Sequence, residues 1–262
     1  MGTPELDGPS AIRLAREFDF DGIDLRVSDN QGELTLQSTD SEIKEIQSSL
    51  NGEGIELVSL FAYNERGNDD DGSWEAMEDS LFNHLELASS LGCPAVRMFG
   101  GDPQKANDTD EHIKRTAEVL HHVFSRHDSD IQIRLQNHAG SFLFTQGQQL
   151  FHLVDNQRFN QVFSPDHCYL MGEDLDEIFP VAKNSSGQIF ISDVLKNDTE
   201  RGFTRTEIGE GEVPLLKSIH CLGDDFDGYL TLKWEKIWNA YLANANEAFP
   251  RFMNWMSEHH FK

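Results

Sequence analysis

The stretch SWEAMEDSLFNHLELASSLGCPAVRMFGG, residues 73–101, contains a complete helix-to-strand unit. A helix is predicted from a capping residue, Ser73, to Gly92, which is typical of a residue just past a helix end. Apolar residues recur along one face of this helix: Leu81, Leu85 and Ala88. Residues 95–101 are mostly apolar and predict a buried strand. Such a unit, when repeated, builds a parallel α/β sheet.

The same alternation runs along the whole chain. Six further strands are predicted, over residues 22–27, 55–63, 131–139, 161–167, 188–194 and 229–235. Helical patterns separate them; one begins at a Thr39-x-x-Glu42 capping box, and the last is predicted over residues 236–258. No linker or shift in composition divides the chain, so a single domain over residues 1–262 is expected.

Seven strands with helices between them predict the α/β class and, within it, a (β/α)8 barrel with its first strand short or missing. The chain opens almost directly on a helix, and the residues before it, MGTPEL, could supply only a stub of strand. The competing architecture is an open doubly wound sheet. It would need a glycine-rich phosphate loop after an early strand, and GEGE at residues 209–212 does not match that pattern.

The composition argues against several kinds of partner. The chain has 46 acidic and 21 Lys and Arg residues, a formal net charge of −25, which disfavours nucleic acid and anionic membranes. Three cysteines without metal-ligand spacing indicate a reducing compartment, and no apolar run approaches the roughly 18 residues of a membrane span. A cytoplasmic protein is therefore expected. An incomplete first strand would leave a sheet edge open, so a homo-oligomer is a further expectation.

Polar side chains follow or end several of the predicted strands. They are Asp24, Gln136, His138, Ser164, Asp166, His167, Asp193 and Lys233. In a (β/α)8 barrel the carboxyl ends of the strands build the active site. This set, with two imidazoles, an ammonium group and several carboxylates, suits a small hydroxyl-rich ligand.

Several segments, in this order, resemble the xylose isomerase-like barrel superfamily of sugar phosphate isomerases and epimerases, which also contains endonuclease IV-type AP endonucleases. They are GIDLR (22–26), IRLQNHAG (133–140), SPDH (164–167), ISDV (191–194) and DGYLTLKWEKIW (227–238). The resemblance covers nearly the whole chain. It implies a (β/α)8 barrel that holds one divalent metal ion with Glu, Asp, His and Glu and moves a proton on a sugar.

The four positions that match these metal ligands carry other residues here: Gln136, Ser164, Phe190 and Lys233. Glutamine offers only a carbonyl oxygen, serine a weak hydroxyl and phenylalanine nothing, while the lysine ammonium repels a cation. We therefore expect no catalytic metal at this position, with Lys233 in the place of the ion.

The resemblance also suggests roles for the polar set. His167, Asp166 and Lys233 are the catalytic candidates. The expected ligand contacts are Gln136, His138, Ser164, Asp193 and Asp24. Several alternatives stay open: a structural salt bridge from Lys233 to Asp166 or Asp193, Schiff-base chemistry at Lys233, and a structural role for Asp24.

Two functions are consistent with this set. The chain could act on a sugar or cyclitol, by metal-free acid–base chemistry or with an ion held by shifted ligands. Alternatively, it could be a pseudoenzyme that binds a sugar-like ligand or a protein. DNA repair is a distant third, because it needs a metal cluster and basic phosphate-binding residues.

Overall fold

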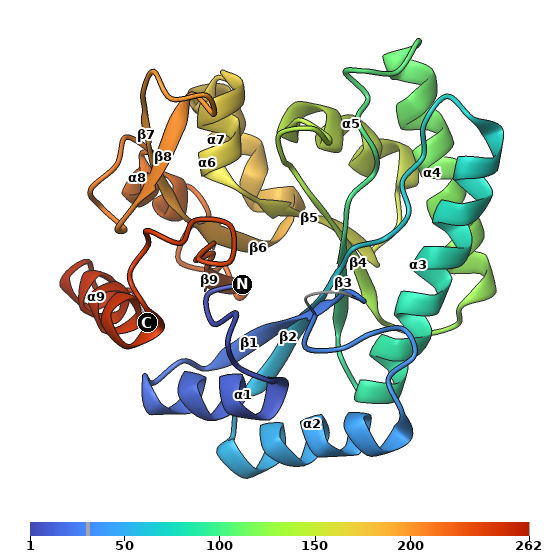
Figure 1. Ribbon diagram of the computed structural model, residues 1–262. Helices are drawn as coiled ribbons and strands as arrows, with labels where there is room; N and C mark the ends of the chain where they lie inside the picture. The colour runs from blue at the N-terminus through green and yellow to red at the C-terminus, as the bar shows by residue number, and fades with distance from the viewer. Residues whose placement is uncertain (30–31, 262) are drawn as a thin grey trace.

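The computed structural model describes residues 1–29 and 32–261, and seven strands of this part form one parallel sheet (Figure 1). Along the sheet they are β1 (Gly22–Val27), β2 (Glu56–Ala62), β3 (Ala95–Met98), β4 (Gln132–Gln136), β5 (Phe159–Phe163), β6 (Ser186–Ile191) and β9 (Tyr229–Leu232). Each strand is parallel to its neighbours. The sheet curls into a barrel that is open on one side, which confirms the predicted α/β barrel class.

Helices surround the curled sheet (Figure 1). They are α1 (Gly8–Glu17), α2 (Asp40–Glu53), α3 (Asp71–Leu91), α4 (Thr109–Arg126), α5 (Phe144–Val154), α6 (Pro165–Met171), α7 (Leu175–Ser185), α8 (Leu215–His220) and α9 (Ala245–Glu258). Their apolar faces and the outer faces of the strands form the main core. None of these helices is long and apolar enough to cross a membrane.

Two helix starts show how local chemistry sets the boundaries. The predicted capping box at α2 is confirmed, because Thr39 and Glu42 each accept a hydrogen bond from the other's backbone N–H. The prediction that Ser73 caps α3 is wrong. The carboxylate of Asp70 accepts a hydrogen bond from the backbone N–H of Gly72, so the cap lies three residues earlier, at Asp70, and the helix begins at Asp71.

Several predicted elements are too long. The strands predicted over 95–101, 131–139, 161–167 and 229–235 end at Met98, Gln136, Phe163 and Leu232, and the last helix begins at Ala245. In the third case Pro165 occupies the first turn of α6, where its missing N–H costs nothing. Asp166 and His167 therefore lie on a short helix and not on a strand.

The strand predicted over 188–194 divides into two. β6 ends at Ile191, and β7 (Asp193–Lys196) then pairs in antiparallel fashion with β8 (Phe203–Thr206). This hairpin, which projects beyond the carboxyl end of β6 (Figure 1), was not predicted from the sequence.

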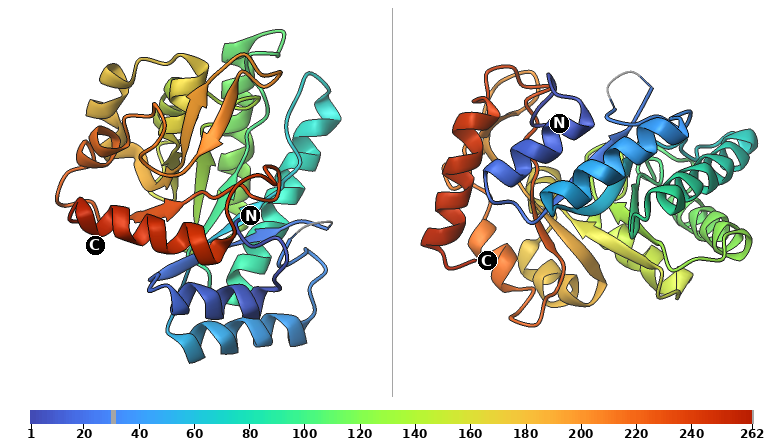
Figure 2. Two further views of the ribbon diagram at one scale, coloured as in Figure 1. Left: turned by 60° about the vertical axis from the view of Figure 1, so that its left-hand side comes forward. Right: turned by 90° about the horizontal axis from the view of Figure 1, so that it is seen from below.

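The open side of the barrel lies between β1 and β9, which do not pair with each other. Residues 1–7 form no strand there, in agreement with the expected missing first strand. Aromatic rings from α9 cover part of the opening: Phe249 packs edge-on against Phe20, with ring centroids 5.2 Å apart. Both views in Figure 2 show α9 beside the N-terminal segment.

Candidate functional site at the barrel mouth

Lys233 follows β9 directly and lies inside the barrel mouth, with 3% of its surface exposed. Its Nζ is 2.7 Å from Nε2 of His167, 3.4 Å from Oδ2 of Asp166 and 3.3 Å from Oε1 of Glu235. Of the two bridges left open by the sequence, the structure forms the one to Asp166. The lysine is thus held by α6 on one side and by its own strand end on the other.

Arg205, on β8, completes this group. Its Nη1 is 2.7 Å from Oδ2 of Asp166, and its Nε is 2.5 Å from Oε2 of Glu235. Nη1 also donates a 2.7 Å hydrogen bond to Oγ of Ser192. Positive and negative side chains therefore alternate around a ring of four, which we call the ion quartet: Lys233, Asp166, Arg205 and Glu235. With two cations and two carboxylates, the quartet is formally neutral.

The charges of the quartet control the ionisation of its carboxylates. Burial alone would raise the pKa of Asp166, but the positive charges of Lys233 and Arg205, together with the hydrogen bond from Arg205, hold it well below its usual range. For Glu235 burial again opposes ionisation, and Lys233 and Arg205 outweigh it, so its pKa is lowered too. Both carboxylates are ionised at neutral pH.

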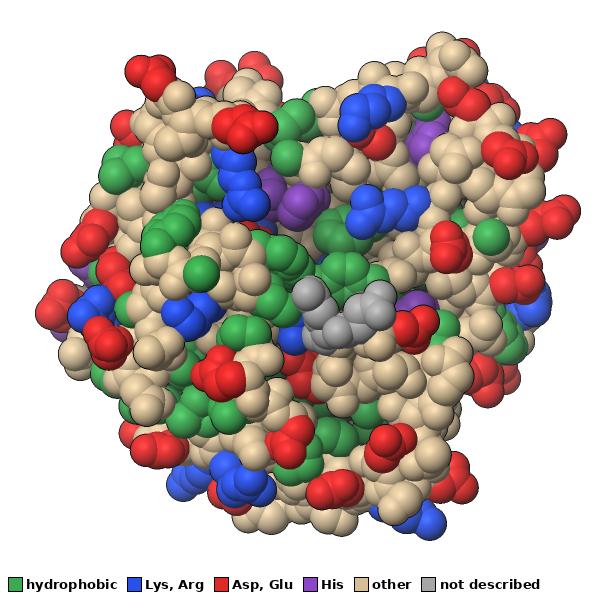
Figure 3. Space-filling model, in the orientation of Figure 1, with side chains coloured by type: hydrophobic (Ala, Val, Ile, Leu, Met, Phe, Trp, Pro, Cys, Tyr) green, Lys and Arg blue, Asp and Glu red, His purple; other side chains and the backbone are tan. Residues whose placement is uncertain are grey.

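Lowered pKa values leave the two histidines of the mouth uncharged, whereas they leave the carboxylates ionised. Burial, and then the charge of Lys233, lower the pKa of His167 well below its ordinary value and that of His138 to about 4. Their rings lie against each other, with centroids 3.8 Å apart. Both imidazoles are neutral at neutral pH. The face in Figure 3 is hollowed near its middle, where histidine side chains lie deep between Lys and Arg side chains.

Gln136 and Ser164 lie together at the ends of β4 and β5. Nε2 of Gln136 donates a 3.4 Å hydrogen bond to Oγ of Ser164. The side chain of Asn137 fixes this pair of strand ends, because it donates to the backbone carbonyl of Ser164 and accepts from its N–H. The structure thus brings six of the eight candidate residues to the mouth: Gln136, His138, Ser164, Asp166, His167 and Lys233.

Asp193 has a different environment. Its carboxylate accepts hydrogen bonds from four backbone N–H groups, those of Val194, Gly209, Gly211 and Val213. The loop 209–213 wraps so closely around it that a Cβ at Gly211 would lie 2.1 Å from Oδ1 of Asp193. These contacts make Asp193 the anchor of the loop. They also give a structural explanation for the glycines of the GEGE segment.

Asp24 lies deeper in the barrel than the ion quartet. Oγ of Ser59 donates to it at 2.6 Å and Nε2 of Gln188 at 2.9 Å. Along β6 and the residue that follows it, the side chains of Gln188, Phe190 and Ser192 lie on the same face, so the ring of Phe190 separates the level of Asp24 from that of Arg205. Phe190 forms an apolar layer there with two other residues, Phe61 and Val162.

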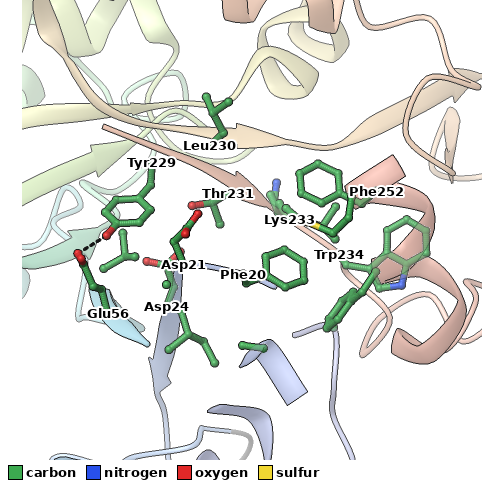
Figure 4. Close-up of a pocket in the computed structure, with 18 of the residues that line it drawn as sticks. Phe20, Asp21, Asp24, Glu56, Tyr229, Leu230, Thr231, Lys233, Trp234 and Phe252 are labelled. Carbon is green, nitrogen blue, oxygen red and sulfur yellow. Dashed lines mark hydrogen bonds between the residues drawn. The ribbon is translucent and has the colours of Figure 1, made fainter. Parts of the chain in front are cut away.

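The electrostatics of Asp24 also differ from those of the mouth. Burial raises its pKa to about 6, although hydrogen bonds from Ser59 and Gln188 and the charge of Arg134 oppose the shift. The carboxyl borders a cavity of about 990 Å³ on the open side of the barrel. In Figure 4 the polar side chains of Asp21, Asp24 and Thr231 lie between Tyr229 and Glu56 on one side and the rings of Phe20, Trp234 and Phe252 on the other.

The residues present do not suit the divalent ion that the resemblance implies. Phe190 has no ligand atom, and its ring packs against Phe61 with centroids 5.2 Å apart. Lys233 and Arg205 already occupy the carboxylates of Asp166 and Glu235. In the part of the chain that the structure describes, no group of three or more His, Cys, Asp or Glu side chains is placed to hold a metal ion.

Arg205 was not predicted from the sequence. Arg97 was recognised at the end of a predicted strand, but neither Arg97 nor Arg66 was among the candidate site residues. Arg97 is 2% exposed, and its guanidinium lies over the rings of Phe61 and Phe99, 4.5 and 4.3 Å from their centroids. Its Nη1 donates to the carbonyl of Ala62, and its Nε has no partner among the described residues. The signal for Arg97 was its place near the end of the apolar run AVRMF.

Aromatic contacts alone do not offset the burial of Arg97. A cation–π contact contributes about 0.5–2 kcal/mol, whereas burying an ion costs several kcal/mol. Burial lowers the pKa of Arg97 to about 10, so the group stays charged at neutral pH. No described residue forms an ion pair with it.

Fold and site together define a (β/α) barrel with a buried, polar mouth. A family model described as xylose isomerase-like TIM barrel matches residues 12–259. The chain belongs to this family. A search of curated proteins gives no match.

Solved structures of the same fold cover nearly the whole chain. The IOLI protein with a binding zinc atom is 16% identical (TM-score 0.79; 98% of this chain and 94% of that one covered). The probable 3-DHS dehydratase AsbF from Bacillus anthracis is 16% identical (TM-score 0.74; 98% and 96% covered). D-psicose 3-epimerase from Clostridium cellulolyticum H10, solved with D-tagatose, is 12% identical (TM-score 0.72; 99% and 96% covered). At these identities the likeness concerns the fold.

Proposed function

We propose that this chain binds a small polyhydroxylated ligand, a sugar or cyclitol, at the barrel mouth, and that the ion quartet takes the place of a divalent metal ion there. The observation that carries the proposal is the position of Lys233, whose buried ammonium group lies among His167, Asp166 and Glu235. A fixed cation at this place can hold a ligand oxygen as a metal ion would. Family membership, and neighbours named as an epimerase and a dehydratase, support this ligand class.

The mouth offers the groups for a metal-free proton transfer. With a ligand carbonyl beside Lys233, the ammonium would stabilise the negative charge that develops when a proton leaves the neighbouring carbon. His167, a neutral imidazole, or Asp166 would accept that proton. Gln136, His138 and Ser164 would bind hydroxyl groups of the ligand.

Binding without turnover is the second candidate, and one observation favours it. The pKa values of Asp166 and His167 are both lowered, by Lys233 among other causes, so both are weak bases at neutral pH. A general base works best with a pKa near the working pH. The quartet would then serve as a rigid, preformed set of hydrogen-bond partners.

Metal content and proton exchange test these proposals together. Protein prepared without chelator is expected to contain Mn or Zn well below stoichiometry by mass spectrometry. Stoichiometric metal that is lost in Ser164→Ala would overturn the metal-free site. Incubation with sugars and inososes in D₂O then separates the candidates: deuterium at the carbon next to the carbonyl indicates catalysis, and calorimetric binding without exchange indicates a binding protein.

A fourfold variant tests the assignment of the ligand positions. This variant combines Gln136→Glu, Ser164→Asp, Phe190→His and Lys233→Glu. It is expected to bind Mn²⁺, which would be seen as a melting temperature that rises with added Mn²⁺. Lys233→Glu alone is the matched control, with three carboxylates near Arg205 but no restored ligand set. A folded fourfold variant that binds no Mn²⁺ would show that the assignment is wrong.

A further inference from the structure

Two arginines at the mouth carry charge that no described residue neutralises. Arg97 and Arg66 both lie over the ring of Phe99, with their guanidinium carbons 4.3 and 4.6 Å from its centroid. Neither forms an ion pair with a described carboxylate, although acidic residues outnumber Lys and Arg by 46 to 21 in this chain. We call Arg66, Arg97 and Phe99 the arginine site.

The arginine site is held in place by its surroundings. Asn64 donates a 2.9 Å hydrogen bond to the carbonyl of Phe99 and accepts a 3.0 Å bond from its N–H. The guanidinium of Arg97 packs between Phe61 and Phe99 and is tied to the carbonyl of Ala62 at 3.1 Å. The positive charge of Arg97 is therefore preformed and does not require a ligand to order it.

The arginine site adjoins the ion quartet. The ring of Phe99 lies edge-on to that of His138, with centroids 5.2 Å apart, and His138 packs on His167, the neighbour of Lys233. Since the cations of the quartet already have carboxylate partners, the unbalanced positive charge of the mouth resides on Arg97 and Arg66.

We propose that the ligand of the mouth carries an anionic group, a carboxylate or a phosphate, and that this group binds to the guanidinium groups of Arg97 and Arg66. Guanidinium donors match the oxygens of both anions and form charge-assisted hydrogen bonds with them. The inference rests on the proposed function, with the polyhydroxylated part of the ligand near His138 and His167. It narrows the ligand class to acids or phosphates of sugars and cyclitols.

Calorimetry with paired probes tests this inference at low ionic strength. D-gluconate is compared with D-glucitol, glucose 6-phosphate with glucose, and inorganic phosphate is titrated alone. We expect an anionic member of at least one pair to bind about tenfold or more tightly than its neutral partner. The pair that shows the difference distinguishes a carboxylate from a phosphate ligand.

Variants locate the binding of the anion. Arg66 is exposed, so Arg66→Ala should fold. It is expected to weaken binding of the anionic probe about tenfold and to leave binding of the neutral probe unchanged. Arg97→Met should have the same effect, and its melting temperature is measured to check that it is folded. Lys105→Ala is the matched control, since Lys105 is an 82% exposed cation already paired with Asp102.

The outcomes separate this inference from the proposed function. Equal binding of anionic and neutral probes, unaffected by Arg66→Ala, would refute anion binding at the arginine site without contradicting the proposed binding of a sugar or cyclitol at the mouth. Binding of inorganic phosphate that Arg66→Ala abolishes, without binding of any sugar, would support the arginine site and refute the proposed sugar or cyclitol binding. If no probe binds, both are refuted.

Discussion

Asp166 and Asp24 are carboxylates inside the same barrel, one at the mouth and one below the Phe190 layer, and their pKa values move in opposite directions. Both are penalised by burial, but Asp166 contacts two cations directly, whereas Asp24 accepts from a neutral hydroxyl and a neutral amide. The pKa is accordingly depressed at Asp166 and raised to about 6 at Asp24. Contact with a full charge, more than the number of hydrogen bonds, decides the ionisation of a buried acid.

The largest effect is expected from removing a cation at the mouth. Lys233→Met keeps the bulk of the side chain but leaves Asp166 and Glu235 with Arg205 alone, and should lower the free energy of unfolding by about 3–5 kcal/mol. Chemical denaturation followed by circular dichroism measures this loss. Lys217→Met is the control, because Lys217 and its partner Asp176 are exposed, and it should change stability far less.

The same variant has a readout that a purely structural role would not give. The charge of Lys233 helps to depress the pKa of His167, so in Lys233→Met this pKa should move upward. An NMR titration of the His167 imidazole reports it. An unchanged histidine pKa in a folded variant would contradict the electrostatic account of the mouth.

A smaller loss is expected at Asp193, where four backbone N–H groups surround the carboxylate. In Asp193→Asn the new amide NH₂ faces donors at Gly209 and Gly211, which leaves buried N–H groups unpaired. This should cost about 1–3 kcal/mol of unfolding free energy. Faster hydrogen exchange should be confined to the loop 209–213. If the exchange rates of the loop did not change, Asp193 would not be its anchor.

The smallest effect is expected at Asp24 and has the opposite sign. Its folded pKa of about 6 lies above the unfolded value, so its contribution to stability is lost as pH rises from about 4 to 6 and stays lost above that range. The free energy of unfolding of Asp24→Asn should therefore equal that of the parent protein at pH 4 and exceed it by about 1–2 kcal/mol at pH 7. The difference is smaller than the full pKa shift would give, because the side cavity screens part of that shift. Denaturation curves at the two pH values decide this, and a variant that is less stable at pH 7 would refute it.

Much of this architecture could be predicted from the sequence, because it depends on local patterns. Alternating apolar runs revealed the seven parallel strands, and strand ends revealed Lys233 near Asp166. Arg205 could not be found in this way, since it reaches the mouth through the pairing of β7 with β8, a tertiary contact. Asp166 was wrongly predicted to lie on a strand. Pro165 starts a short helix there, and the four residues SPDH alone did not indicate that helix.

The open side of the barrel has a consequence for motion. β9 is hydrogen-bonded to β6 along one edge and has no strand partner along the other among residues 1–29 and 32–261, so we expect it to open locally at a lower free energy than β4, which is paired on both edges. Lys233 and Glu235 continue from β9 into the ion quartet and fasten this strand to α6 and β8. A ligand at the mouth would bind all three segments at once. Binding of the proposed ligand would therefore be thermodynamically linked to closure of this edge strand.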